Sequence, residues 1–187
     1  TGHWPHQLYV REARRMVGDF VATQKDLQTD RTKPDFIGMG SYQSDSHNIQ
    51  RIVNRKGFVE NEGDVQVPVQ PYQIPYRVMV PKRADAENLL VPVCFSASHI
   101  AYASLRMEPQ FMILGHAAGV AASLAVKNNA ALQDVNVADM QKTLLSEGAV
   151  FEYGVEHQQK ALSVIRRRYA PPPSKTPIPW ARPEPTK

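Results

Sequence analysis

Side chains that could transfer protons occur at two places in the chain. Asp45 and His47 lie two positions apart and could act as an acid/base pair. His99 follows Ser96 and Ser98 in a short polar segment after an apolar run. Doubly wound folds bind ligands where a strand gives way to such a loop. We therefore expect this segment to contact a ligand, with His99 or His47 as the candidate base.

Two further groups of residues could bind a substrate. A dense charged cluster near the start of the sequence consists of Arg11, Glu12, Arg14 and Arg15. On its own, such a cluster is more typical of a solvated or salt-bridged surface than of a binding site. Later in the sequence, Tyr76 and Arg77 could line a pocket.

Several enzyme signatures are absent from the sequence. Gly38 and Gly40 are followed by Gln43 where the dinucleotide fingerprint requires a third glycine. The sequence also has no Walker loop, no HExxH and no paired CxxC motif, and its histidines lack metal-ligand spacing, so we expect no metal site. The single cysteine, Cys94, lies in an apolar run, as a core thiol would.

Composition narrows the function classes further. The 187 residues carry a formal net charge of +4, yet residues 160–187 alone hold seven cations and one anion. Because the positive charge belongs to this proline-rich tail and not to one folded face, we expect no nucleic-acid partner. We find no run of about 18 apolar residues, so we expect a soluble chain without a membrane span.

Local patterns predict a series of strands and helices. Strands are expected at 15–23, 35–40, 65–69 and 88–95, the last apolar on both faces as a central strand would be. A turn is expected at 63–64. Helices are expected at 109–127, at 137–147 with Gly148 as the stop, and at 155–168.

The first of these helices carries an unusual stripe of small residues. Gly115, Ala118, Gly119 and Ala122 recur at spacings of three, four and seven, which places them on one face of a helix. Two glycines cost such a helix about 2 kcal/mol relative to alanine. We infer that the close approach of a backbone or a flat ligand compensates for that cost.

In their order and spacing, several stretches resemble one known family. They are residues 9–16, 45–47, 72–77, 88–92, 96–99, and 106–109 leading into 115–122. Over roughly residues 8–150 the chain resembles the C-terminal part of FAD-dependent oxidoreductases of the glutathione-reductase-like superfamily, in the group that includes xanthan-lyase-like proteins. His116 stands where that family usually has glutamine.

The resemblance implies a fold class and a domain organisation. The expected fold is α/β (mixed α+β), the C-terminal portion of a two-domain, FAD-binding, Rossmann-like flavoprotein that lacks the N-terminal dinucleotide-binding βαβ unit. Residues 1–87 would belong to the substrate or cap domain and 88–150 to the FAD-binding domain. Residues 151–170 would form a C-terminal helix and 171–187 a proline-rich basic tail.

The resemblance also implies FAD as the cofactor and assigns roles to residues. The helix from Pro109 would aim its electropositive end at the flavin. The implied cofactor-binding residues are Ser96, Ser98, Arg106, Glu108, Gly115, Ala118 and Gly119. The implied substrate-binding residues are Arg11, Arg14, Tyr76 and Arg77. For Arg106 and Glu108, a structural ion pair at the helix start is an equally good interpretation.

These expectations lead to two hypotheses about function. In the first, the chain completes the flavin site and substrate pocket for hydride or electron transfer on a small organic substrate. Its partner is the N-terminal FAD-binding half, and the chain alone is not expected to be active. In the second, it is a non-catalytic structural or carbohydrate-associated protein with a flavoprotein-like fold. Relatives are often exported, but the sequence identifies neither the localisation, the substrate nor the electron acceptor.

Overall fold

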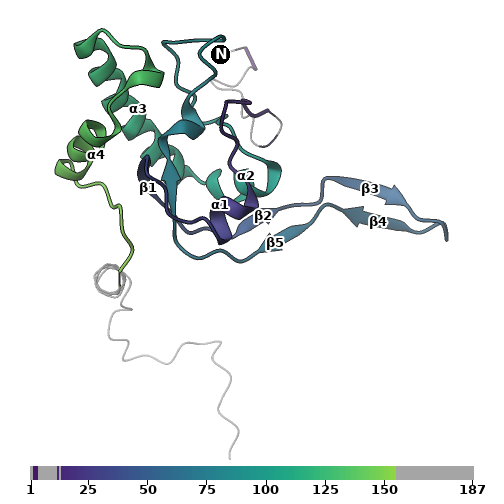
Figure 1. Cartoon of the computed structure of the whole chain (residues 1–187). Coiled ribbons are helices and arrows are strands. Elements are labelled where there is room, and N and C mark those ends of the chain that lie inside the picture. Colours follow the sequence, from purple (N-terminus) through teal and green to yellow (C-terminus); the bar gives the residue numbers. More distant parts are fainter. Residues whose placement is uncertain (1, 4–11, 13, 155–187) are drawn as a thin grey trace, which may run out of the picture. The chain divides into compact units, whose positions relative to one another are not determined.

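The computed structural model describes residues 2–3, 12 and 14–154, and the part up to Glu152 forms one compact unit (Figure 1). Its α-helices are α1 (Gln24–Gln28), α2 (His99–Leu105), α3 (Glu108–Asn128) and α4 (Val137–Ser146). Its strands are β1 (Phe36–Gly40), β2 (Ser44–Ser46), β3 (Gln50–Val53), β4 (Val59–Glu62), β5 (Val65–Val67) and β6 (Tyr72–Pro75). Two short 3-10 helices are η1 (Tyr76–Met79) and η2 (Leu132–Asp134).

The strands form three separate antiparallel pairs, β1–β6, β2–β5 and β3–β4. Among the described residues, the one parallel pairing is an isolated bridge between Ala22 and Ala97. The described part is therefore a mixed α+β structure with small sheets, and the Rossmann-like two-domain arrangement stays a prediction.

The β2–β5 and β3–β4 pairs follow one another along a two-stranded ribbon that extends away from the helices (Figure 1). At the junction, Gly63 has a φ of +94°, which favours glycine, and a Cβ there would come within 2.7 Å of the Ile49 side chain. The turn expected at 63–64 is wrong: β4 continues through this junction into β5, and the chain reverses at 55–57 between β3 and β4. Beyond the junction, all residues of β3 and β4 are exposed.

Two predicted strands are wrong. Segment 88–95 is irregular, with Leu89 half exposed and Val93 also exposed, so it is not buried on both faces. Pro92 has no N–H to donate, and Val91 N bonds to Met79 O whereas Cys94 O accepts from Met16 N. Single bonds to different segments do not make a ladder. Segment 15–23 is likewise irregular, with a bend at 19–20, and joins no strand pair beyond the bridge at Ala22.

Strands at 35–40 and 65–69 and helices α3 and α4 are confirmed, apart from small shifts at their ends. α4 ends before Gly148, whose φ is +90°, and buries Met140 and Leu144 but leaves Leu145 exposed. The helix predicted at 155–168 and the proline-rich tail lie outside the described residues.

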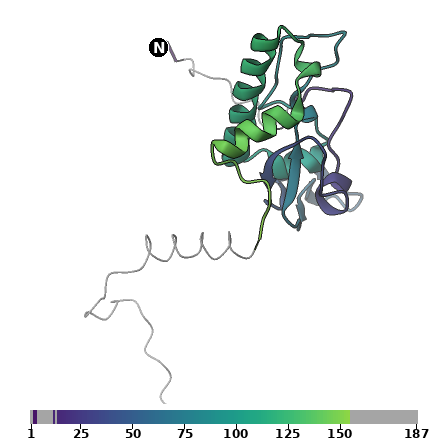
Figure 2. The same ribbon diagram turned by 60° about the vertical axis from the view of Figure 1, so that its left-hand side comes forward.

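Helix α3 is the longest element and packs beside α4 and against β1 (Figure 2). Its N-cap is Met107 and its first residue is Glu108, one position before the expected start at 109. Its inward residues Leu114, Ala117 and Ala121 are buried in the core. By length and composition α3 could cross a membrane, which corrects the expectation that no segment could. This is weak evidence for a span, because the core helix of a soluble protein passes the same test.

Candidate functional site

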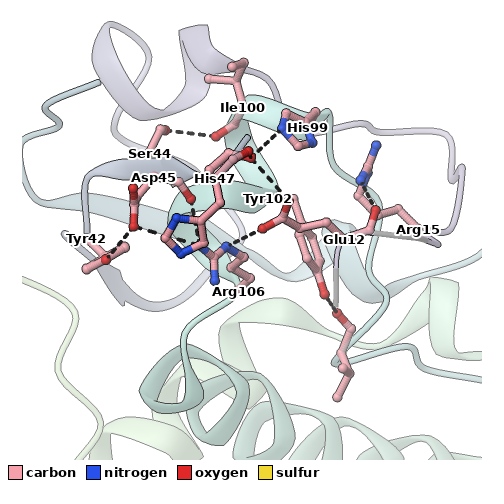
Figure 3. A network of polar contacts seen from close by, with 12 residues as sticks. Glu12, Arg15, Tyr42, Ser44, Asp45, His47, His99, Ile100, Tyr102 and Arg106 are labelled. Atoms are coloured by element: carbon pink, nitrogen blue, oxygen red, sulfur yellow. Dashed lines mark hydrogen bonds and ion pairs between the residues drawn. The ribbon is translucent and has the colours of Figure 1, made fainter. Parts of the chain in front are cut away.

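The start of α2 is fixed against β2 by serine side chains. Ser44 donates from Oγ to the carbonyl oxygen of Ile100 at 2.9 Å. Ser98 is the N-cap of α2, and its Oγ accepts from the backbone N–H of Ala101 at 3.3 Å. Because the cap residue sets where the helix begins, these bonds place His99, the first residue of α2, next to the strand (Figure 3).

A chain of polar contacts runs inward from His99 (Figure 3). His99 Nε2 lies 3.0 Å from Ser46 Oγ, and Ser46 Oγ donates to Glu12 Oε2 at 3.3 Å. The other carboxylate oxygen of Glu12 lies 2.9 Å from Arg106 Nε. Ser46 is fully buried and His99 half-buried, so the chain joins the interior to a side chain that solvent can reach.

Arg106 ties this chain of contacts to β2. Its side chain is 8% exposed, and Nη2 donates to the carbonyl oxygen of Asp45 at 2.7 Å. The carboxylate of Asp45 lies 4.0 Å from the same Nη2 and accepts from the Tyr42 hydroxyl at 3.2 Å. The ion pairs that Arg106 forms are therefore with Glu12 and Asp45, whereas Glu108 is exposed at the start of α3.

The three candidate proton-transfer residues come from neighbouring elements. Asp45 lies in β2, His47 follows β2 directly, and His99 begins α2, which packs against β2. The Asp45 carboxylate contacts Tyr42 and Arg106, while His47 is exposed. Their catalytic roles, including the pairing of Asp45 with His47, stay predictions.

The residues predicted for ligand binding in the 96–98 loop have structural contacts. Ser96 is buried, and its Oγ accepts from the backbone N–H of Gly18 at 3.0 Å. Ser98 caps α2, as described above. Both bonds hold the backbone around His99 in place, and contact of these serines with a cofactor stays a prediction.

The predicted substrate-binding residues are dispersed. Tyr76 in η1 is buried and donates to Leu132 O at 2.9 Å, and burial raises the pKa of its phenol. Arg77 forms an ion pair with Asp35 at 3.6 Å and lies with its guanidinium carbon 4.4 Å from the ring centroid of Phe20. Neither residue joins the contacts around His99. Arg14 is exposed, and Arg11 lies outside the described residues. Their substrate role stays a prediction.

The small-residue stripe of α3 is open. Gly115, Gly119 and Ala122 are exposed, Ala118 is half-buried, and a Cβ added at either glycine would meet no atom within 4 Å. The two glycines line a groove beside α4, together with Ser123 and Glu147 among others. No described part of this chain makes the close approach that the stripe predicts.

The start of α3 has features that fit a flavin. Gln110, in the first turn, is buried, and its Oε1 has no hydrogen-bond partner among the described atoms. A helix N-terminus also offers free N–H groups and the positive end of the helix dipole. The pyrimidine edge of a flavin carries carbonyl oxygens, which the exposed end of such a helix can bind, whereas Gln110 Oε1 is enclosed on the buried face of α3. The residues present therefore fit the cofactor.

Sequence reasoning missed the connecting residues of this site. Ser46 was not considered, and Glu12 was noted only as part of a charged cluster. The available signal was the alternation of Ser44 and Ser46 in a short strand, which points both side chains to one face. Nothing in the sequence indicates that this face lies against His99, which is 53 positions away.

Comparisons with known proteins give one result. A family model described as FAD dependent oxidoreductase matches residues 1–144. No curated protein and no solved structure matches this chain.

Proposed function

The chain belongs to the family of FAD-dependent oxidoreductases, and on this basis we propose that it completes the flavin site and substrate pocket of a two-part enzyme. The proposed reaction is hydride or electron transfer on a small organic substrate. The proposed partner is an N-terminal half that holds the nucleotide part of FAD, either as a separate chain or as a preceding part of the same one. The absence of the Gly-rich dinucleotide fingerprint from this sequence supports the assignment of the nucleotide part of FAD to the partner half.

The observation that carries the proposal is the open face of α3. A 21-residue helix leaves its glycines uncovered and keeps a buried, unpaired amide oxygen in its first turn. Unpaired buried acceptors are costly, and glycines weaken a helix. The cost of the glycines is offset when a flat ligand or the partner half covers this face, whereas Gln110 lies on the opposite, buried face with Leu114 and Ala117.

The bound flavin supplies a two-electron acceptor that no side chain of this protein provides. The remaining requirements are a base for the substrate's proton and groups that orient that base. His99 offers an imidazole at the surface, held by Ser46 from behind. The start of α3 would hold the pyrimidine edge of the flavin.

The alternative, a non-catalytic structural or carbohydrate-associated protein, keeps the glycines of α3 for packing alone. Within the described residues nothing packs on Gly119, so this alternative gains no support from α3. An exchange of Gly119 separates the two hypotheses, because an added Cβ there would meet no atom of the described chain within 4 Å.

The first experiment is a visible absorption spectrum of the native assembly containing this chain, with and without dithionite. We expect a flavin band that dithionite bleaches. Gly119→Leu should release the flavin while the thermal unfolding temperature is maintained, whereas the matched variant Gly119→Ala should retain more of it. A colourless native assembly, or a Gly119→Leu variant with full flavin content, would contradict the proposal.

A further inference from the structure

We propose that Arg106, Glu12 and Ser46 form an orienting chain that fixes the tautomer of His99 and leaves its Nδ1 atom free to accept a proton. The inference rests on the function proposed above, because it assigns roles within the same site. Ser46 and Glu12 act through His99 and are positioning residues. His99 is the residue that would touch the substrate.

The direction of the hydrogen bonds follows from the neighbours of Ser46. Its Oγ lies 3.3 Å from a carboxylate oxygen of Glu12 and 3.4 Å from the carbonyl oxygen of His47. The hydroxyl proton of Ser46 has three acceptors within reach, the Glu12 carboxylate, the His47 carbonyl oxygen and His99 Nε2. We infer that it goes to Glu12, because a charged acceptor forms the stronger hydrogen bond. Ser46 Oγ must then accept from His99 Nε2, 3.0 Å away. Neutral His99 therefore carries its proton on Nε2 and a lone pair on Nδ1.

The inner end of the chain is an ion pair between Glu12 and Arg106, although Arg106 Nε forms no well-aligned hydrogen bond among the described atoms. The Glu12 carboxylate faces the guanidinium of Arg106, and Arg106 also donates to the backbone of Asp45 in β2. Both Ser46 and Arg106 are buried, so their side chains have little freedom to turn away. The charged groups of the network are thus Glu12, Asp45 and Arg106, with the exposed His47 beside them.

This arrangement suits the oxidation of a small alcohol or amine. In such an oxidation a bound flavin would accept the hydride and its two electrons from the substrate carbon, and the substrate heteroatom would lose a proton as the carbon–heteroatom double bond forms. His99 Nδ1 accepts that proton, and the imidazolium keeps its Nε2–H bond to Ser46. Since His99 is half-buried and not enclosed, it can return the proton to solvent after turnover.

The tautomer can be measured without any cofactor. The full chain, labelled with ¹⁵N-histidine, is studied by NMR near pH 8, and the His99 signals are assigned by their loss in His99→Gln. We expect a protonated Nε2 and a bare Nδ1. In Ser46→Ala the two nitrogen shifts should move toward each other as both tautomers are populated. In Glu12→Gln, which keeps the side-chain volume, we expect a smaller movement in the same direction.

The matched control is Ser44→Ala. Ser44 is buried in the same strand and faces the same side as Ser46, but donates to Ile100 O and not to His99. Its loss removes an anchor of α2 but no bond to His99, so the His99 shifts should move less than in Ser46→Ala. A bare Nε2 in the wild type, or identical His99 shifts in Ser46→Ala and wild type, would overturn the proposal.

The kinetic test uses the flavin-loaded assembly. Ser46→Ala should lower kcat about five- to tenfold, the factor expected for one ordinary hydrogen bond, with little change in KM. Ser46→Thr, which keeps the hydroxyl group, should restore most of the loss. An unchanged kcat in Ser46→Ala would overturn the role of Nδ1. A flavin-free assembly that still shows the expected tautomer would contradict the proposed function but support the orienting chain.

Discussion

The two faces of α3 differ in how far the described chain covers them. The inner face, with Leu114, Ala117 and Ala121, is fully buried against the core. On the outer side Met112 is 73% exposed and Val126 83% exposed, and the glycines between them are uncovered. Both faces are apolar, yet one of them alone has a partner within the described chain.

This difference shows that the two faces of one helix have different roles. The inner residues stabilise the fold, because buried apolar side chains contribute most of the free energy of folding. The outer residues do not contribute to that energy, and exposed apolar residues gathered on one helix face are typical of an interaction site. Substitutions on the two faces should therefore separate stability from binding.

The largest effect is expected on the inner face. Leu114→Ala should lower the free energy of unfolding by about 2–5 kcal/mol, because it removes buried methyl groups and leaves a cavity. Met112→Ala is the matched control on the outer face and should change it by less than about 0.5 kcal/mol. Urea denaturation followed by circular dichroism measures both. Equal losses in the two variants would mean that the faces do not differ.

A charge on the outer face should affect binding without affecting the fold. Met112→Lys should weaken association with the FAD-holding half about tenfold or more, because the charge would be buried in that contact. The unfolding temperature of the Met112→Lys variant should be the same as that of the Met112→Ala variant. Titration of one half with the other, read by flavin fluorescence, gives the affinity. Unchanged affinity would place the partner elsewhere.

The smallest expected effect on stability is a gain and not a loss. Gly115→Ala should raise the free energy of unfolding by about 1 kcal/mol, because alanine favours the helix and the added methyl group meets no atom within 4 Å. The same methyl group should reduce flavin content if the cofactor approaches there. Thermal denaturation and the absorbance of bound flavin report the two effects separately. A destabilised variant would reveal a contact on Gly115 that the described residues do not make.

The sequence predicted the elements whose signals are local. Helices α3 and α4 were predicted from periodicity and stop signals, and β1 and β5 from short apolar runs between turn residues. Segment 88–95 was misread, because an apolar run does not say whether a neighbouring strand exists to pair with it. Here Pro92 and single bonds to different segments leave it irregular.

The candidate site was predicted in part for the same reason. Asp45, His47 and His99 were recognised by residue type, and the structure places them on adjacent elements. Ser46 and the role of Glu12 were missed, because their function depends on the packing of α2 against β2. Arg106 was expected near a cofactor, and its pairing with Glu12 became visible only in three dimensions.

The exposed β3–β4 hairpin should unfold locally, independently of the core. A two-stranded hairpin with both faces in water has little free energy to hold it, so its hydrogen bonds break and reform without unfolding of the core. Amide exchange at its tip then follows local opening, while exchange in α3 follows global unfolding. Amide protons of the helical interior should therefore exchange slowly and those of the β3–β4 hairpin rapidly. A protease that cleaves after Arg55 or Lys56 at the tip of the hairpin should cut there before it cuts the core.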